Sequence, residues 1–306
     1  MSEPVTKVAV EPVADAHPVA PPPPFPTTPP SPVSGDTHRV DLLGMAIDRV
    51  TEEQTVGIVL NSLETGAGGW IITPNADHLR RFRKSPEIRD LFAQADLSVA
   101  DGMPLVWASS LQNTPLPERV AGSNLIWTLS RAAGAAGRSV FLLGGDDGVA
   151  ERAAEELRLD TPSLRIAGTH CPPVGFEDSS REMRDLRRVL VSARPDIVFV
   201  GLGFPKQEKL IAELRELMPA TWFLGIGISL SFVSGDVPRA PEWMWAAGLE
   251  WLHRLITEPR RLFERYIRHG LPFVFGMLMR CGARGIRARL RRGHAGDLAP
   301  AEQPAA

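Results

Sequence analysis

Residues 196–211 read DIVFVGLGFPKQEKLI, and this stretch decides how the chain folds. Its first half is an almost uninterrupted apolar run, which is typical of a parallel strand covered by helices on both faces. The glycines that follow permit a tight turn, and Pro205 suits the first turn of a helix. The stretch therefore predicts a strand, a tight turn and a helix, which together form the repeating unit of an α/β fold.

The same alternation continues on both sides of this stretch, from residue 38 onward. Apolar, strand-like runs occupy residues 39–47, 70–74, 97–101, 139–145, 164–170, 196–203 and 221–227. Helix-like patterns occupy residues 86–95, 123–137, 148–158, 180–193 and 205–218. Strands that alternate with helices predict an α/β protein with a mostly parallel sheet and helices on both faces. The order of the strands does not follow from these patterns.

Composition divides the chain into four segments. Residues 1–36 are rich in proline, which favours extended polyproline II over a packed core, so we predict a disordered tail. Residues 37–247 form the predicted α/β domain, residues 248–293 a basic helical appendage, and residues 294–306 a flexible tail. The sequence assigns no role to the proline-rich segment.

Positive charge is concentrated in the appendage. Eleven arginines lie between Arg254 and Arg292, with no lysine and with Glu258 and Glu264 as the only acids. This segment carries about +9 and the rest of the chain about −11, within a total of −2. Arginines beside the apolar residues 272–279 are typical of a helix that lies on an anionic membrane surface.

Broader features exclude several classes of protein. The 306 residues are 43% hydrophobic and 23% charged, which is ordinary for a soluble globular protein. Cys171 and Cys281 lie far apart and without metal-ligand spacing, so we predict neither a disulfide framework nor a zinc site. No apolar run reaches the length of a transmembrane helix and no secretory signal is seen, so we expect a cytoplasmic location.

Polar residues follow two predicted strands at their carboxyl ends, where ligands bind in open α/β sheets. Thr73, Asn75 and His78 follow one strand, and Asp101 follows the next. A carboxylate in the position of Asp101 serves either as the cap of the following helix or as a general base. Spacing favours the cap, and the residues alone leave both roles open.

Glycines follow two further predicted strands, at residues 144–145 and at residues 201–203. Gly144 and Gly145 precede a helix, and a loop of this kind presents backbone N–H groups to phosphate. Neither G-x-G-x-x-G nor G-x-x-x-x-G-K-[ST] occurs there, so tight turns explain the glycines equally well. Asp146 and Asp147 suggest a metal site, although capping of the next helix is the simpler interpretation.

Six motifs, taken together and in order, resemble the WecG/TagA/CpsF family of bacterial glycosyltransferases. They are TPNADH (73–78), ADGMPLVWAS (100–109), ERVAGSNL (118–125), FLLGG (141–145), GLGFPKQE (201–208) and RAPEWMWAAGLEWLHRLITEPRRLFERYI (239–267). The resemblance covers residues 38–270, and the last motif is its most distinctive part. One departure is Pro238, because many relatives carry a basic residue directly before RAP.

The resemblance implies a reaction and its partners. We expect an inverting, metal-independent transfer of N-acetylmannosamine or a related hexose from a UDP-sugar to a saccharide carried on a polyprenyl diphosphate. The product would serve cell-surface or exopolysaccharide synthesis. No cofactor is expected, since the UDP-sugar is a substrate. The appendage would dock on the inner, anionic face of the cytoplasmic membrane, and a homo-oligomer is possible within the family.

The same resemblance assigns roles to individual residues. Asp101 takes the place of the family's catalytic aspartate, which overrides the preference for a cap. The substrate-binding positions implied are Thr73, Asn75, Arg119, Gln207, Gly144, Gly145, Arg254, Arg261 and Arg265. Arg254, Arg261 and Arg265 recur at a spacing that places them on one face of a helix, provided that Pro259 does not bend it away.

Two other functions stay open. One is a membrane-recruited protein that binds a nucleotide sugar without transferring it. The other is a nucleotide-dependent oxidoreductase on a doubly wound sheet, which the missing G-x-G-x-x-G motif disfavours. Nucleic acid is not an expected partner, because arginine is confined to one terminal segment and no aromatic-studded sheet motif is present.

Overall fold

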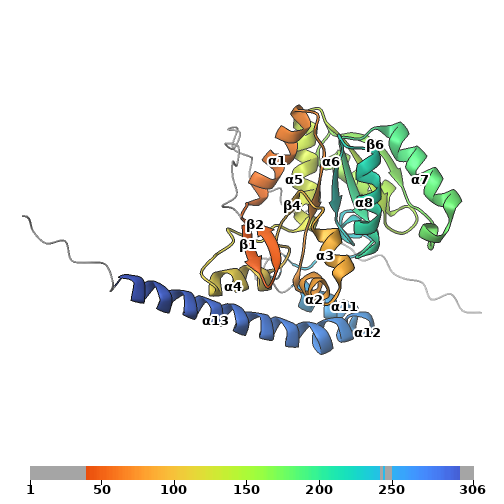
Figure 1. Cartoon of the computed structure of the whole chain (residues 1–306). Helices are drawn as coiled ribbons and strands as arrows, with labels where there is room; N and C mark the ends of the chain where they lie inside the picture. Colours follow the sequence, from red (N-terminus) through yellow and green to blue (C-terminus); the bar gives the residue numbers. More distant parts are fainter. Residues whose placement is uncertain (1–38, 242–243, 245–249, 297–306) are drawn as a thin grey trace, which may run out of the picture. The chain divides into compact units, whose positions relative to one another are not determined.

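A computed structural model describes residues 39–241, 244 and 250–296 (Figure 1). The predicted tail at residues 1–36 lies outside the described residues, as does the end of the predicted tail at residues 294–306. The last helix runs to Gly296, past the predicted boundary at residue 293.

The centre of the fold is a six-stranded sheet in the order β4-β3-β8-β7-β5-β6. Each neighbouring pair is parallel. The strands are β3 (Gly69–Ile72), β4 (Leu97–Ser98), β5 (Ser139–Gly144), β6 (Arg165–His170), β7 (Ile197–Gly201) and β8 (Trp222–Gly225). The predicted α/β class with a parallel sheet is confirmed.

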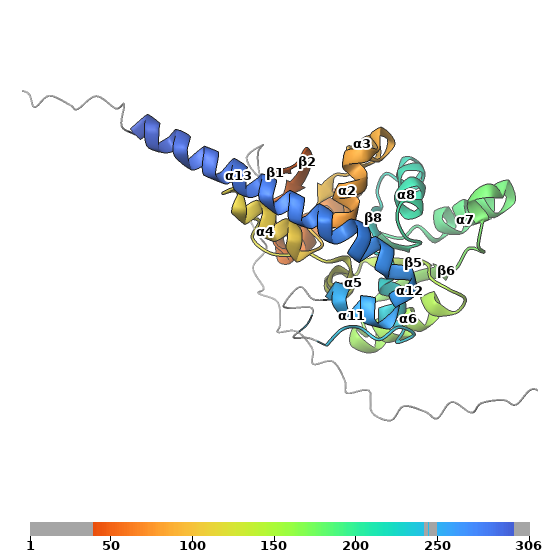
Figure 2. The ribbon, with the colours of Figure 1, turned by 90° about the horizontal axis from the view of Figure 1, so that it is seen from below.

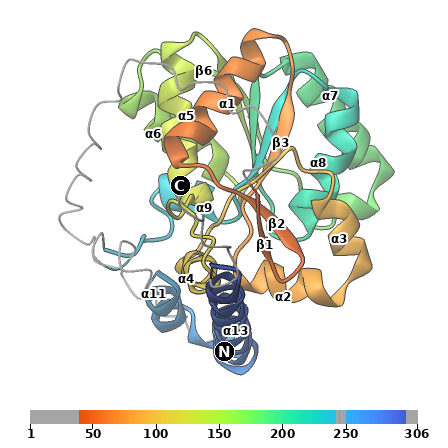
Figure 3. The same ribbon diagram turned by 60° about the vertical axis from the view of Figure 1, so that its left-hand side comes forward.

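Helices cover both faces of the sheet (Figure 3). On β7, Ile197 and Phe199 belong to one apolar core while Val198 and Val200 belong to the other, as the two-residue period of a strand requires. The first core is completed by α1 (Glu52–Glu64), α5 (Gly122–Ala135), α6 (Val149–Asp160) and α9 (Ser229–Val233). The second is completed by α2 (Ala76–Lys84), α3 (Pro86–Phe92), α4 (Met103–Leu111), α7 (Ser180–Ala193) and α8 (Lys206–Leu217).

Residues 39–47, predicted as one strand, form an antiparallel hairpin outside the main sheet. β1 (Arg39–Leu42) pairs with β2 (Met45–Asp48). The turn consists of Leu43 and Gly44, with φ values of 54° and 97°, and positive φ at both central residues suits a two-residue hairpin turn. The apolar run hides this turn, because leucine rarely adopts positive φ.

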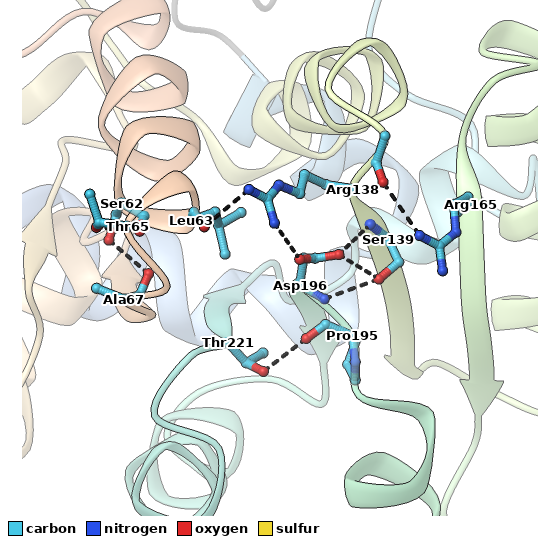
Figure 4. A network of polar contacts seen from close by, with 11 residues as sticks. Ser62, Leu63, Thr65, Ala67, Arg138, Ser139, Arg165, Pro195, Asp196 and Thr221 are labelled. Atoms are coloured by element: carbon cyan, nitrogen blue, oxygen red, sulfur yellow. Dashed lines mark hydrogen bonds and ion pairs between the residues drawn. The ribbon is translucent and has the colours of Figure 1, made fainter.

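A polar network ties the central strands together at their amino-terminal ends (Figure 4). The Asp196 carboxylate accepts hydrogen bonds from the Ser139 backbone N–H and hydroxyl, each at 2.7 Å, and from Arg138 at 3.2 Å. Burial acts to raise the pKa of Asp196, but the bonds from Ser139 and Arg138 outweigh it and lower the pKa. Polar side chains are thus satisfied at this edge, which is opposite the carboxyl ends of the strands.

The predicted basic appendage is helical. It comprises α11 (Glu250–Thr257), α12 (Pro259–Phe263), the π-helical turn η2 (Glu264–Gly270) and α13 (Leu271–Gly296). Figures 1 and 2 show α13 running alongside α4. Gly285 makes this close contact possible, because a Cβ at that position would lie 2.1 Å from the Leu111 carbonyl oxygen. Asn113 donates a hydrogen bond to the Gly285 carbonyl at 2.9 Å. None of the described helices is long and apolar enough to cross a membrane.

Candidate active site

A cavity of about 480 Å³ opens at the carboxyl ends of β3, β4, β7 and β8, within the usual size range of small-molecule sites. The strand-end loops form one side and the appendage forms another. Among the predicted site residues, the lining includes Thr73, Asn75, Asp101, Arg119, Gln207, Arg254 and Arg265. Segments that are far apart in sequence therefore meet around one space.

Asn75 both caps α2 and faces the cavity. Its side-chain oxygen accepts from the backbone N–H of Asp77 at 3.0 Å and of His78 at 3.2 Å. Since these bonds occupy the oxygen, the amide NH₂ is the part of Asn75 that can bind a ligand. Thr73 is buried beside it, with its hydroxyl 3.5 Å from the Gly225 carbonyl oxygen.

His78 is part of the cavity wall rather than an independent acid. Its Nδ1 accepts from the Asn75 backbone N–H at 3.3 Å, and its ring lies 4.4 Å from that of Phe204, between centroids. Burial, helped by Arg265, lowers the pKa of His78 to about 4. The ring is therefore neutral near pH 7 and braces the loop that carries Asn75.

Asp101 does not cap the helix that follows it. The N-cap of α4 is Gly102, and no side chain caps that helix. The Asp101 backbone N–H donates to the Pro74 carbonyl at 2.8 Å, which holds the carboxylate next to the Thr73–Asn75 loop. The first of the two alternative roles thus lacks the hydrogen bond that defines it, and the side chain lines the cavity.

The surroundings of Asp101 adjust its acidity. Burial raises the pKa of Asp101 to about 6, Glu250 adds to the rise, and Arg119, Arg239 and Arg254 oppose it. A carboxylate with a pKa just below neutral is ionised at pH 7 and is a better proton acceptor than an exposed aspartate. The cavity therefore contains a carboxylate suited to general base catalysis.

Arg119 is positioned by a residue of the appendage. Its Nη1 lies 3.4 Å from Oε2 of Glu250, the first residue of α11, and both side chains are largely buried. Glu250 also lines the cavity. Its contact with Arg119 was not predicted, and its place inside the motif at 239–267 was the available signal.

Gln207 braces the cavity floor. Its side-chain oxygen accepts from the backbone N–H of Gly203 at 3.2 Å and of Gly227 at 3.1 Å. Its Nε2 donates to Glu208 at 2.8 Å, and burial raises the pKa of Glu208 to about 7. The amide thereby joins the loops after β7 and β8, so its geometry explains loop positioning more directly than sugar binding.

The appendage arginines do not share one continuous helix, because α11 ends at Thr257 and α12 begins at Pro259, so the expected single face is wrong. Arg254 lines the cavity, with its guanidinium carbon 6.0 Å from the Phe232 ring centroid. Arg265 lines it too, and its Nε lies 3.1 Å from Asp77 Oδ2. Arg261 lies in α12, and its side chain falls outside the described part of the structure.

Gly144 and Gly145 do not line the cavity. A Cβ at Gly144 would lie 2.5 Å from the Gly201 carbonyl oxygen, so close packing of neighbouring strands accounts for this glycine. Their donor-binding role stays a prediction. Asp146 and Asp147 do not cap α6 either, because its N-cap is Gly148 and no side-chain bond is made there. Within the described residues, no three His, Cys, Asp or Glu side chains are grouped as a metal site requires.

Comparison with known proteins shows two similar chains. Two similar proteins, from Bacillus spizizenii and Bacillus subtilis (strain 168), are each named N-acetylglucosaminyldiphosphoundecaprenol N-acetyl-beta-D-mannosaminyltransferase. The first is 33% identical over 199 residues, which span 65% of this chain and 75% of the relative. The second is 33% identical over 195 residues, which span 63% of this chain and 73% of the relative.

A family model gives the wider match. The model of the glycosyl transferase WecG/TagA/CpsF family aligns with residues 40–286, which include the strand ends, the cavity and most of the appendage. The resemblance inferred from six motifs is thereby confirmed. The chain belongs to the WecG/TagA/CpsF family of glycosyl transferases.

Proposed function

We propose that this glycosyltransferase moves N-acetylmannosamine or a related hexose from a UDP-sugar to a saccharide carried on a polyprenyl diphosphate. The transfer inverts the anomeric carbon and uses no metal. The names of the two Bacillus relatives support the sugar and the lipid-linked acceptor. The observation that carries the proposal is the Asp101 carboxylate, which faces the cavity with a raised pKa and with cationic side chains nearby.

In the proposed mechanism Asp101 removes the proton from the acceptor hydroxyl. The hydroxyl oxygen then bonds to the anomeric carbon of the donor as the bond from that carbon to the diphosphate oxygen breaks. Attack from the face opposite the leaving group gives inversion in a single step, so no covalent nucleophile on the protein is needed. The proton stays on Asp101 until the product leaves.

Cationic side chains stabilise the leaving diphosphate in this scheme. Arg119 and Arg254 line the cavity and supply charge-assisted hydrogen bonds of the kind a departing phosphate requires. Thr73 and Asn75 line the same cavity. In this scheme the Thr73 hydroxyl and the Asn75 amide NH₂ bind sugar hydroxyls. Glu250 lies 3.4 Å from Arg119, so the donor diphosphate would compete with that carboxylate for the guanidinium.

We also propose that the enzyme works at the inner face of the cytoplasmic membrane, where a polyprenyl-linked acceptor resides. The arginine-rich appendage and the exposed apolar side chains of α13 support this location. Deletion of residues 248–306 tests it, because full activity on a lipid acceptor after that deletion would contradict a membrane role. In this proposal the appendage serves both catalysis and membrane docking, because it also supplies Glu250 and Arg254 to the cavity.

The direct test measures UDP release from a panel of UDP-sugars, with and without a soluble polyprenyl-diphosphate-N-acetylglucosamine analogue. Wild type is compared with Asp101→Asn. The control is Asp178→Asn, which removes an exposed carboxylate that does not line the cavity. We expect acceptor-dependent release from one donor, lost only in Asp101→Asn. Equal release in Asp101→Asn would remove Asp101 from the catalytic role.

The same assay separates the two other functions considered from the sequence. UDP binding without release from any donor, across a range of acceptors, would favour a protein that binds a nucleotide sugar without transferring it. The oxidoreductase alternative has no support from a chain that belongs to a glycosyl transferase family and lacks the G-x-G-x-x-G motif.

A further inference from the structure

A second cavity, of about 310 Å³, lies away from the active site. It is formed by the β1–β2 turn, the C-terminal end of α2 and the middle of α13. Its lining consists of Leu43, Arg83, Arg280, Ala283, Arg284 and Arg287. It shares no lining residue with the active-site cavity.

Positive charge in this cavity is largely uncompensated. Arg284 is the one lining arginine with an acidic partner, at 3.1 Å from Asp41. Arg83, Arg280 and Arg287 make no side-chain hydrogen bond or ion pair with any residue in the described ranges 39–241, 244 and 250–296. Arg83 of α2 and Arg280 and Arg287 of α13 therefore line one cavity without an acidic partner among the described residues, an arrangement that favours a multivalent anion such as phosphate.

An exposed apolar stripe runs beside these arginines on α13. Phe275, Met279, Ile286 and Leu290 are 61–68% exposed. At about 100° per residue, these four side chains fall within an arc of about 60°. Arg280, Arg284 and Arg287 fall within an adjacent arc of about the same width, between the stripe and the helix face that packs on the domain. Met277 and Cys281 mark that buried face.

We infer that the second cavity binds the phosphate head group of an anionic phospholipid, with the acyl chains against the α13 stripe. A head group needs cationic donors at the polar–apolar boundary, and the arginine row occupies that boundary. A free phosphate would use the arginines alone and leave the stripe in water. The stripe is what favours a lipid, because helices that lie in a membrane interface combine an arginine-rich face with exposed apolar residues.

The inference rests on the membrane location in the proposed function and is independent of the transfer chemistry. Val274 of α13 lines the active-site cavity and Arg284 lines the second one. With a rise of 1.5 Å per residue, they lie about 15 Å apart along the helix. A phospholipid held at the second cavity would therefore place the head-group layer next to the active-site cavity.

The main test compares two arginines on the same helix. Full-length Arg287→Gln and Arg291→Gln each lose one exposed positive charge, but Arg291 does not line the cavity. Partition onto vesicles of phosphatidylcholine mixed with phosphatidylglycerol is measured by flotation. We expect Arg291→Gln to weaken partition by up to about fivefold, the effect of one surface charge. Arg287→Gln should weaken it by tenfold or more. Equal losses would overturn the specific site.

A second experiment separates a lipid from a free anion. Calorimetry on the full chain uses soluble short-chain phosphatidylglycerol, glycerol phosphate and inorganic phosphate. We expect the short-chain lipid to bind at least tenfold more tightly than either phosphate, and Ile286→Ser to remove most of that advantage while leaving phosphate binding unchanged. Equal affinity for the three ligands, or no binding of the lipid, would overturn the lipid assignment.

The assay with the water-soluble acceptor keeps this inference apart from the proposed function. Arg287→Gln should release UDP at the wild-type rate, because the cavity lies outside the active site. Suppose that wild type releases no UDP, and that vesicle partition is weakened tenfold or more by Arg287→Gln but not by Arg291→Gln. The lipid site then stands and the proposed transfer fails. A large loss of soluble activity in Arg287→Gln, with vesicle affinity intact, would overturn the lipid site.

Discussion

Arg265 of the appendage places its Nε 3.1 Å from Oδ2 of Asp77, in the first turn of α2. Asp77 is buried and also contacts Arg80, at 2.7 Å. Burial acts to raise the pKa of Asp77, but Arg265, Arg80 and Arg81 together lower it. This ion pair therefore connects the appendage to the loop that carries Thr73 and Asn75.

Removing the Arg265 guanidinium should weaken that connection. We expect Arg265→Gln to lower the free energy of unfolding by about 1–2 kcal/mol, because Asp77 keeps Arg80 as a partner. The loss should be largest near neutral pH and disappear in acid, since a carboxyl whose folded-state pKa is lowered stabilises only above that pKa. Urea unfolding at several pH values measures it.

Arg268→Gln is the matched control for this change. Arg268 pairs with Glu264 at 3.5 Å on the surface, with both side chains largely exposed. Its loss should cost no more than about 0.5 kcal/mol. Equal costs for the two variants would show that the contact between Arg265 and Asp77 contributes nothing particular to docking.

The activity of the enzyme should fall on the acid side of a pKa near 6. Protonation of Asp101 removes the base, and burial raises its pKa to about 6. Asp101→Asn should lower kcat by about 10²–10⁴-fold. The pH profile of kcat/KM for the soluble acceptor measures the free-enzyme pKa, and a limb near pH 4 would contradict a raised value.

The same carboxylate should reduce stability above its pKa. Because folding raises the pKa of Asp101, the folded state binds its proton more tightly, and stability falls as pH rises from about 4 to 6. Asp101→Asn should therefore be more stable than wild type at pH 8, by roughly 1–2 kcal/mol, with the difference vanishing near pH 4. Urea unfolding at these two pH values tests the sign, and a less stable variant at pH 8 would contradict it.

Gln207→Leu should loosen the cavity floor. The substitution leaves the N–H groups of Gly203 and Gly227 and the Glu208 carboxyl without their bonds to Gln207. Unsatisfied buried groups cost about 1–3 kcal/mol each before relaxation, so a loss of about 2–4 kcal/mol in stability is expected, with a higher KM for the donor. Gln94→Leu, on the surface, is the control and should have neither effect. An unchanged KM would show that the bridge is not needed for binding.

Gly285→Ala should detach α13 from α4. The new Cβ would lie 2.1 Å from the Leu111 carbonyl oxygen, so one helix must move. We expect faster hydrogen exchange along α13 and a loss of about 1–3 kcal/mol in the free energy of unfolding, the usual cost of overpacking.

Gly282→Ala and Gly276→Ala are the controls for this change, since a Cβ there meets nothing within 4 Å. They should stabilise the helix by about 0.5–1 kcal/mol. Similar behaviour of all three variants would contradict close packing at Gly285.

Local sequence patterns identified most of the central fold, because each strand and helix is encoded within a few residues. The run around Val198 and Phe199 predicted a strand covered on both faces, and the structure confirms it. The patterns did not identify α4, because apolar residues such as Trp107 and Leu111 remain exposed on it and few polar positions mark a helical period. The hairpin turn at Leu43 was hidden for a related reason, since its backbone conformation leaves no mark in the residue type.

Less of the candidate site than of the fold could be predicted from the sequence. Motif resemblance selected residues that the structure places around one cavity, including Asp101 and Arg119. It did not predict that the Gln207 oxygen is occupied by two backbone N–H groups, or that Glu250 reaches Arg119 from the appendage. Such facts depend on which loops meet in space, and residue spacing along the chain does not contain them.

The Asp196 network has a consequence for how the enzyme can diversify. The Asp196 bonds link the amino-terminal ends of β5, β7 and β8, and the cavity lies at the other edge of the sheet. Changes in the loops after the strands therefore leave the alignment of the strands intact. A library that varies those loops should yield folded enzymes with new sugar preferences far more often than one that varies Ser139 or Asp196. Substrate preference can therefore change in evolution while the sheet stays the same.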